Sequence, residues 1–237
     1  MEGRPRPVID VQEVSRVYRI TDELQVRALD SVSLRIERGE YVAVMGHSGS
    51  GKTTLMNILG CLDAPSSGRY LLDGVDVRHI DEDDLSDLRN RKIGFVFQSY
   101  NLVARTTALS NVELPLAYGG LGRAERRERA ARALRAVGMG SRMNHTPAEL
   151  SGGQQQRVAV ARAIVMNPAL ILADEPTGNL DSASGAEVLQ IFDRLNAQGR
   201  TIVLITHESD VAARAHRVVR LGDGHILEDR RVGEAVA

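Results

Sequence analysis

The sequence is poor in several residue types on which specialised classes of protein depend. It has no tryptophan, aromatic residues make up only 3% of its 237 positions, and Cys61 is its single cysteine. One cysteine cannot form an intramolecular disulfide, and no cysteine–histidine cluster has the spacing of a zinc site, so a reducing compartment such as the cytosol is favoured. No apolar run approaches the about 20 residues that span a bilayer. The N-terminus has no apolar stretch followed by a cleavage signal, and we expect the chain not to enter the membrane by itself.

An excess of charge of one sign is also missing. Lys and Arg together number 30 and Asp and Glu 31, which gives a net charge of −1. No global positive field therefore indicates a nucleic-acid or anionic-membrane surface. Hydrophobic residues make up 43% of the chain, which argues against disorder and predicts a core of aliphatic side chains. The length of 237 residues fits one large domain or two small, closely packed lobes.

The apolar residues follow two patterns, which predict two kinds of strand. Partial alternation over 8–14 and 29–36 is typical of half-buried antiparallel strands. Continuous apolar runs, typical of strands covered on both faces, occupy 41–45, 169–173 and 201–205. Residues from about 84 to 165 are mainly helical in pattern, including a helix over 123–137 after the Gly-rich break at 119–122. The prediction is an α/β protein with a mostly parallel sheet, an N-terminal antiparallel part and an inserted helical lobe.

A phosphate-binding loop follows the first continuous apolar run. Residues 46–53 read Gly-His-Ser-Gly-Ser-Gly-Lys-Thr and satisfy the order of strand, GxxxxGK[ST] and helix. Backbone N–H groups and the helix N-terminus would face the phosphates, Lys52 would reach the β- and γ-phosphates, and Thr53 would ligate Mg²⁺. A specific role for Lys52 is supported by the near absence of lysine, since Lys92 is the other one. The expected nucleotide-binding residues here are Gly46, His47, Ser48, Gly49, Ser50, Gly51, Lys52, Thr53 and Thr54.

Two acids end the second continuous apolar run. The segment 170–175 reads Leu-Ile-Leu-Ala-Asp-Glu. A strand that ends in two adjacent carboxylates can direct one toward a Mg²⁺ ion and the other toward an attacking water. We therefore expect Asp174 to bind the metal and Glu175 to act as the general base.

A third motif, Leu-Ser-Gly-Gly-Gln at 150–154, precedes a helix-compatible run and indicates a second anion-binding helix N-terminus. Together with the phosphate loop and the acidic strand, it resembles the nucleotide-binding subunit of ATP-binding-cassette (ABC) transporters over nearly the whole chain. The resemblance implies a P-loop NTPase core and a single ABC ATPase domain over 1–237. Its α/β core would comprise about 1–83 and 166–237, and its helical subdomain about 84–165.

The resemblance also implies roles for residues outside the first two motifs. Gln98 corresponds to the glutamine that touches Mg²⁺ and senses the attacking water, and His207 to the switch histidine that contacts the γ-phosphate. Asp181 would face the partner's phosphate loop, and Tyr18 would stack on adenine. The residues that complete the site of a second, identical subunit are Ser151, Gly152, Gly153 and Gln154. The sequence departs from the family where His47 replaces the common Pro and Thr53 the commoner Ser; Thr53 retains the hydroxyl.

The function that the resemblance implies is ATP hydrolysis that powers a membrane permease from the cytoplasmic face, with segment 99–116 receiving the permease. The motif style is similar to the macrolide-exporter and lipoprotein-releasing group. The alternative is an ABC ATPase without a transport role that acts on the cell-division machinery, ribosomes or DNA. The chain lacks the second cassette and the long coiled coil of such proteins, and the six Arg and two Glu of 123–135 are expected to form a solvated helix face. The sequence does not indicate the substrate or the direction of transport.

Overall fold

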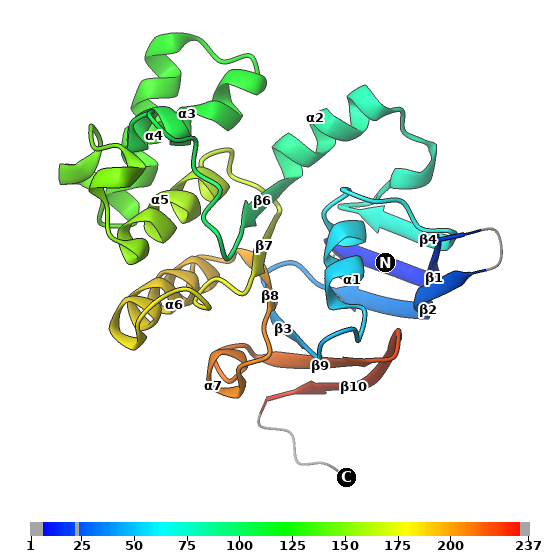
Figure 1. Ribbon diagram of the computed structural model, residues 1–237. Coiled ribbons are helices and arrows are strands. Elements are labelled where there is room, and N and C mark those ends of the chain that lie inside the picture. Colours follow the sequence, from blue (N-terminus) through cyan, green and yellow to red (C-terminus); the bar gives the residue numbers. More distant parts are fainter. Residues whose placement is uncertain (1–6, 22–23, 233–237) are drawn as a thin grey trace, which may run out of the picture. The chain divides into compact units, whose positions relative to one another are not determined.

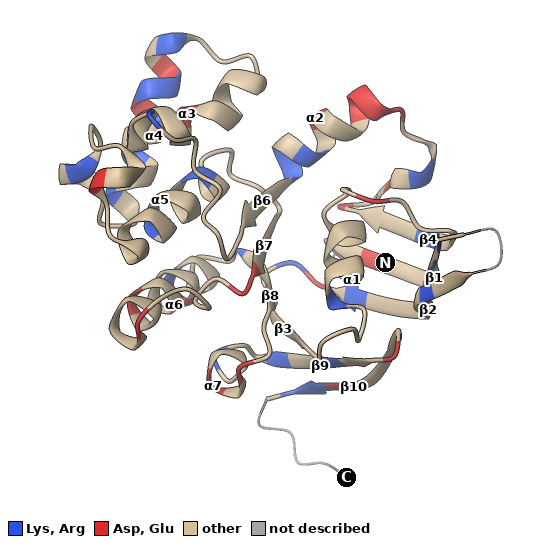
Figure 2. Ribbon diagram, viewed as in Figure 1, with Lys and Arg blue, Asp and Glu red and all other residues tan. Residues whose placement is uncertain are grey.

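The computed structural model describes residues 7–21 and 24–232 and divides the chain into two compact units. The first unit joins Met1–Leu85 to Gly199–Ala237, and the second comprises Ser86–Gln198. The chain crosses from one unit to the other within helix α2, Glu82–Lys92. Acidic residues begin this helix and basic residues end it (Figure 2). The charges at both ends therefore interact favourably with the helix dipole.

The first unit contains an antiparallel sheet built from the half-buried N-terminal strands (Figure 1). The strand order is β2-β1-β4-β5, with bounds Ile9–Arg19 for β1, Gln25–Ile36 for β2, Ser67–Leu72 for β4 and Val75–Asp76 for β5. Strand β1 pairs with β2 from Ile9 opposite Ile36 to Arg19 opposite Gln25, with irregularities between. Burial alternates along the second half of β2, as the predicted half-buried strand requires.

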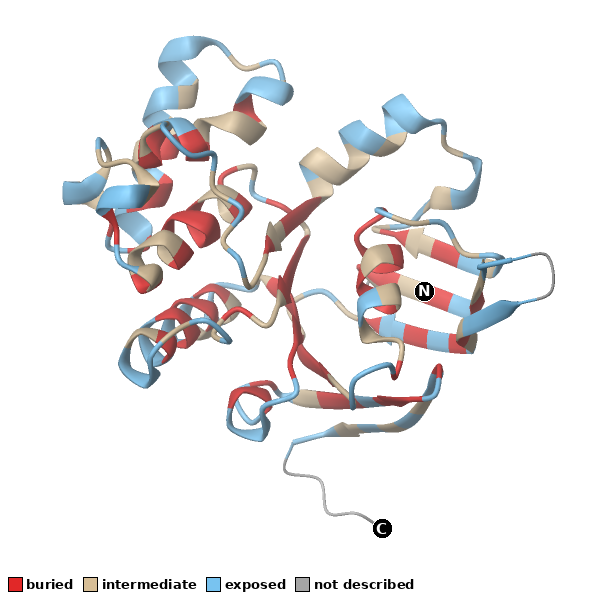
Figure 3. Ribbon diagram, in the orientation of Figure 1, coloured by how far each residue is buried: buried red, intermediate tan, exposed pale blue. Residues whose placement is uncertain are grey.

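A second group of strands in the same unit is parallel and deeply buried. Strand β3 (Tyr41–Met45) lies between β8 (Thr201–Ile205) and β9 (Arg217–Gly222) and pairs with both in parallel, and β10 (His225–Arg231) pairs antiparallel with β9. Every residue of β8 is buried, as are the first four of β3 (Figure 3). The helices of this unit include α1 (Lys52–Leu59) and α7 (Ser209–Ala212), with a 3₁₀ turn at Val77–His79.

The second unit is mainly helical. Its elements are β6 (Ile93–Val96), α3 (Ala108–Tyr118), α4 (Arg123–Ala136), α5 (Gly152–Ile164), β7 (Leu170–Asp174) and α6 (Ser182–Ala197), with 3₁₀ turns at Gly140–Arg142 and Pro147–Glu149. Strands β6 and β7 pair in parallel. At Gly94 of β6 a Cβ atom would overlap the carbonyl oxygen of Ala163, so glycine lets β6 lie directly against α5.

Helix α4 confirms the expected amphipathic pattern. Ala130, Ala133 and Leu134 are buried, whereas most of its arginines are exposed and lie on the outer surface of this unit (Figure 2). Arg129 and Arg132 pair with glutamates four residues earlier on the same helix. The α/β class with a mostly parallel sheet, an antiparallel N-terminal part and a helical insertion is therefore confirmed, whereas the boundaries of about 84 and 165 stay predictions.

Candidate functional site

The loop between β3 and α1 takes the form that its glycines permit. Gly49 and Gly51 have φ angles of 80° and 103°, in the region that side chains other than glycine rarely adopt. A Cβ on Gly51 would lie 2.6 Å from the carbonyl oxygen of Ala28, and one on Gly46 would overlap that of Leu221. The loop is therefore pressed against its neighbours at two of its glycines. Ser50 is fully buried within it.

Lys52 is the first residue of α1 and folds back across this loop. Its Nζ donates to the carbonyl oxygens of Gly46 and His47 at 2.7 and 2.8 Å. The first turn of α1 contains no acidic residue, so no local carboxylate offsets the positive end of the helix dipole. This arrangement presents an ammonium group and a helix N-terminus together, which is an anion-binding geometry.

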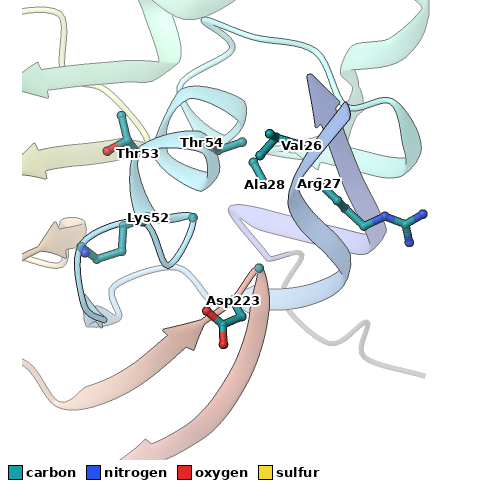
Figure 4. A pocket seen from close by; sticks show the side chains of 10 residues that line it. Val26, Arg27, Ala28, Lys52, Thr53, Thr54 and Asp223 are labelled. Atoms are coloured by element: carbon teal, nitrogen blue, oxygen red, sulfur yellow. The ribbon is translucent and has the colours of Figure 1, made fainter. Parts of the chain in front are cut away.

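A pocket of about 370 Å³ opens beside the loop, entirely within the first unit. Figure 4 shows Lys52, Thr53 and Thr54 on one side and Val26 and Ala28 on another, with Arg27 directed away. Asp223, in the turn between β9 and β10, lies at its lower edge and is 92% exposed. The backbone of Gly49, Gly51 and Gly224 completes the lining.

His47, the residue that departs from the family pattern, is exposed at this loop. Its Nδ1 lies 2.7 Å from the carbonyl oxygen of Ser48, and its Nε2 lies 3.6 Å from an oxygen of Asp223. Both side chains are mainly in solvent, so this pair has little energetic weight. Nothing in these contacts assigns a role to His47.

Among the three tyrosines of the first unit, Tyr18 has the most accessible side chain. Tyr41 and Tyr70 are 1% and 0% exposed, whereas Tyr18 is of intermediate exposure. Tyr18 pairs across the sheet with Val26, which lines the pocket. The structure thus places Tyr18 next to a wall of the pocket.

The predicted metal ligands Asp174 and Gln98 and the predicted general base Glu175 lie in the second unit, near the end of β7. Asp174 is the last residue of β7, and Glu175 follows it with a left-handed φ of 42°, which is uncommon for this residue type. A Cβ on Gly178 would lie 2.7 Å from Nε2 of Gln98 and 3.4 Å from an oxygen of Glu175. Gln98 and Glu175 therefore approach the same glycine, and the structure brings these two predicted residues together.

Gln98 contacts Asn179, and the sequence analysis did not predict this contact. Nε2 of Gln98 donates to Oδ1 of Asn179 at 3.3 Å, and Nδ2 of Asn179 donates to the backbone carbonyl oxygen of Gln98 at 3.2 Å. The Asn179 side chain therefore bonds both the side chain and the backbone of Gln98. No spacing rule links residues 81 apart, so no sequence signal could have found this pair.

The Leu-Ser-Gly-Gly-Gln segment caps α5. Ser151 Oγ accepts from the backbone N–H of Gln154 at 3.3 Å, and Gln154 Oε1 accepts from that of Ser151 at 3.2 Å. This is a capping box, which fixes the helix start. A Cβ on Gly152 would lie 2.7 Å from the hydroxyl of Tyr100, and one on Gly153 2.8 Å from Ser184. The two glycines allow close packing while Ser151 stays exposed.

Gln156, two residues beyond this motif, was also missed. It is fully buried, and its Nε2 donates to the carbonyl oxygens of Pro176 at 2.7 Å and Phe97 at 3.3 Å. It thereby joins α5 to the segments next to Gln98 and Glu175. The available sequence signal is its spacing of three, four and seven residues from Ala159, Val160 and Ala163. This spacing puts a polar side chain on the apolar face of the helix, where it needs an internal partner.

The two remaining predicted residues, Asp181 and His207, lie next to the ends of secondary-structure elements, one in each unit. Asp181 caps α6, accepting from the backbone N–H groups of Ser184 and Ala183 at 3.0 and 3.1 Å, and these donors hold the pKa of its carboxyl below the ordinary value. His207 is exposed two residues after β8, in the first unit. The first unit thus carries the phosphate loop, Tyr18 and His207, and the second carries the acids, Gln98 and the 151–154 motif.

The known proteins whose sequences are similar to this chain share one family. The family model described as ABC transporter matches residues 29–178. The macrolide export ATP-binding/permease protein MacB of Hyphomonas neptunium is 54% identical over 98% of this chain, but the match covers 36% of that relative. This chain therefore spans about a third of the length of such relatives. An uncharacterized ABC transporter ATP-binding protein, YknY of Bacillus subtilis, is 52% identical over 96% of this chain and 100% of its own length.

Solved structures give the same grouping. The ATP-binding cassette MJ0796, in a dimeric post-hydrolysis state bound to ADP and Pi, superposes with a TM-score of 0.87 at 43% identity, over 96% of this chain and 100% of the other. The structure of cbiO1 from Clostridium perfringens, part of the ABC transporter complex cbiONQ, has a TM-score of 0.85 at 29% identity, over 95% of this chain and 89% of the other.

Proposed function

The chain belongs to the ABC transporter family as an ATP-binding cassette, and we propose that it hydrolyses ATP as one half of a dimer that powers a membrane permease. The observation that carries the proposal is the phosphate loop of the first unit. Glycines in left-handed conformations, the Lys52 ammonium and an uncompensated helix N-terminus converge beside a pocket of about 370 Å³. A triphosphate is the ligand that best fits this donor set.

In this proposal, the loop residues 46–54 bind the phosphates and Tyr18 stacks on the adenine. The exposed hydroxyl of Thr53 lies at the pocket and suits Mg²⁺, which prefers oxygen ligands (Figure 4). Thr53, Gln98 and Asp174 would hold this ion, which offsets developing negative charge on the phosphates when bound. The donor set is all oxygen, as a magnesium site requires.

Glu175 would accept the proton from a water that attacks the γ-phosphorus while the bond to the ADP oxygen breaks. Gln98 would orient that water, and the two hydrogen bonds of Asn179, to the side chain and to the backbone of Gln98, support a fixed orientation. His207 would contact the γ-phosphate. Positioning and charge stabilisation carry most of the rate enhancement in phosphoryl transfer, so small displacements of these groups should be costly.

The dimer would be head to tail, since the chain has one phosphate loop and one Leu-Ser-Gly-Gly-Gln motif. Ser151, Gly152, Gly153 and Gln154 of one subunit would complete the site of the other, with Asp181 facing the partner's phosphate loop. The exposed, box-capped N-terminus of α5 supports this assignment, because a capped but solvent-facing helix start remains free to approach an anion. Two-fold symmetry then makes the two sites equivalent.

The permease would bind segment 99–116 at the cytoplasmic face of a membrane. No helix within residues 7–21 and 24–232 is long and apolar enough to cross one. Val103 supports this contact surface, because it is an apolar side chain 46% exposed in the loop before α3. We retain 84–165 as the helical subdomain that carries this surface, and export or lipoprotein release as the type of transport.

The base assignment is tested with Glu175→Gln, which keeps the shape of the side chain and removes its basicity. ATP turnover should fall at least 100-fold while ATP binding is retained, and ATP should drive the variant into a stable dimer. Glu128→Gln, on the exposed face of α4, is the matched control and should turn over ATP normally. Unchanged turnover in Glu175→Gln would refute the assignment.

The transport assignment is tested by affinity purification of the tagged chain from mildly solubilised native membranes. A polytopic membrane protein should co-purify in stoichiometric amount, and Val103→Glu should reduce its recovery. Tyr118→Ser removes another exposed apolar side chain of the same unit, 79% exposed at the far end of α3, and should not. Recovery with ribosomes or DNA and no membrane protein would leave the ATPase assignment standing and overturn the transport assignment.

A further inference from the structure

The Tyr18 side chain is held by two residues from different parts of the first unit. Its hydroxyl donates to Oδ2 of Asp63 at 2.8 Å. The guanidinium carbon of Arg16 lies 4.6 Å from the centre of its ring, within cation–π range. Arg16 in turn pairs with Oδ1 of Asp63 at 2.7 Å. The three side chains therefore form a closed triangle, in which each carboxylate oxygen serves a different partner.

The triangle is partly shielded from water, and its carboxylate is fixed independently. The side chains of Arg16 and Asp63 are 24% and 21% exposed. The backbone N–H of Ala64 also donates to Oδ1 of Asp63 at 2.8 Å, which orients the carboxylate. An ion pair that keeps contact with water adds little to stability, so the firmer consequence of this arrangement is geometric. It holds the hydroxyl end of the Tyr18 ring in place and covers one face of the ring with Arg16.

The same triangle connects with the nucleotide pocket along two routes. Tyr18 lies opposite Val26 in the β1–β2 register, and Val26 lines the pocket (Figure 4). Asp63 follows α1, whose first residue, Lys52, lines the pocket as well. The ring is thus tied to the strand beside the pocket and to the chain that leaves the phosphate-binding helix.

We propose that Arg16 and Asp63 are positioning residues that hold the Tyr18 ring ready for adenine, with Arg16 on one face and the base on the other. This inference rests on the proposed function, in which Tyr18 stacks on the base of ATP. A long side chain that is already immobilised loses less freedom when ligand binds, and this preorganisation increases affinity. Asp63 supplies the immobilisation through the hydroxyl, so a tyrosine at position 18 is not equivalent to a phenylalanine.

A merely structural tie between β1 and the segment after α1 would have a different signature. Loss of such a tie would loosen the phosphate loop as well and weaken every ligand of the pocket. Loss of a positioned ring would weaken only ligands that carry a base. Dissociation constants for ATP and for tripolyphosphate, which has no base, separate the two roles when both are measured on the full chain.

Asp63→Ala and Tyr18→Phe should each weaken ATP binding about 3- to 10-fold, the range expected from one newly mobile side chain, and leave the tripolyphosphate constant within twofold. The double variant should be little weaker than Asp63→Ala, since both changes remove the same hydrogen bond. Asp63→Asn retains an acceptor for the hydroxyl and should restore much of the affinity. Asp73→Ala, which removes the partner of Arg38 elsewhere in this unit, is the matched control and should change neither constant.

Tyr18→Ala separates this inference from the function on which it rests. If Tyr18→Ala leaves ATP binding unchanged, the adenine assignment fails and the positioning role fails with it. If Tyr18→Ala weakens ATP binding while Asp63→Ala and Tyr18→Phe do not, the adenine assignment stands and the positioning role is overturned. Equal weakening of ATP and tripolyphosphate in Asp63→Ala and Tyr18→Phe would also overturn it. Because Tyr18→Phe removes a single oxygen atom, it tests the inference even if Asp63→Ala does not fold.

Discussion

Asn111 of α3 is expected to be the polar side chain that organises the loop before that helix. It is fully buried. Its Oδ1 accepts from the backbone N–H of Val103 at 2.7 Å, and its Nδ2 lies within hydrogen-bond distance of three oxygens: Thr106 Oγ1 at 2.8 Å, the Thr107 carbonyl at 3.1 Å and the Val103 carbonyl at 3.2 Å. An amide NH₂ group has two hydrogens, so the side chain makes about three effective hydrogen bonds. The loop that we assign to the permease depends on them.

Asn111→Ala should lower the free energy of unfolding by about 3 kcal/mol, at about 1 kcal/mol for each of the three hydrogen bonds. The carbonyl oxygens of Val103 and Thr107 retain other donors, because the Thr106 hydroxyl donates to the first and the backbone N–H of residue 111 donates to the second. The main group left without a partner is the Val103 N–H. Urea unfolding of the full chain, followed by circular dichroism, measures the change, provided that a single transition is seen.

Asn111→Asp tests the same reasoning through the direction in which stability changes with pH. A carboxylate would keep the contact with the Val103 N–H but would face carbonyl oxygens without a donor, so its pKa should rise in the folded state. With a raised pKa, the stability of this variant falls as pH rises from the ordinary pKa of an aspartate to the raised folded-state value, and it recovers only as pH is lowered below that value. Ala117→Gln, at an exposed position of the same helix, serves as the control. A loss in Asn111→Ala no larger than that of the control would refute the hydrogen-bond reasoning.

Three further predictions concern the same unit. Gly94→Ala should destabilise the protein by about 3 kcal/mol, visible as a lower urea midpoint, because its Cβ would overlap the carbonyl oxygen of Ala163; wild-type stability would contradict the close packing. Arg162→Lys should lower the free energy of unfolding by about 2 kcal/mol and speed amide hydrogen exchange at 99–101. The reason is that the guanidinium donates to the carbonyl oxygens of Tyr100 and Asn101 at 2.9 and 2.5 Å. Unchanged exchange would show that this pair of hydrogen bonds is dispensable. Asp181→Ala should lower the melting temperature at neutral pH. The difference in melting temperature between this variant and the unmodified chain should shrink as pH falls through the pKa of Asp181, which is lowered below the ordinary value of an aspartate. A difference that does not depend on pH would rule out the charged cap as its cause.

The strands and helices were largely predictable because their signals are local. The continuous apolar runs predicted buried strands, and β3, β7 and β8 lie within one residue of them. The start of α1 at Lys52 and of α4 at Arg123 followed from the phosphate-loop motif and from the glycine-rich break. Periodicity of two or 3.6 residues and turn chemistry are properties of neighbouring residues, and the chain order alone displays them.

The contacts that fix the site side chains were not predictable. Tyr18 could be placed by resemblance, but Arg16 and Asp63 carry no motif, and Asp63 lies 45 residues away. The partners of Gln98 and Gln156 are equally remote in sequence. Such contacts depend on irregular register between β1 and β2 and on the paths of loops, which no local pattern encodes.

The sequence by itself determined the chemistry available to this protein: the phosphate loop, the acidic pair, the second helix-start motif and the strands that carry them. These are short segments whose residue types and spacing suffice for their local conformation. The tertiary structure alone decided which residues hold those groups in place, such as Asp63 on the Tyr18 hydroxyl or Asn179 on Gln98. The physical reason is that a hydrogen bond requires two groups within about 3 Å, and for groups far apart in sequence only the packed chain sets that distance.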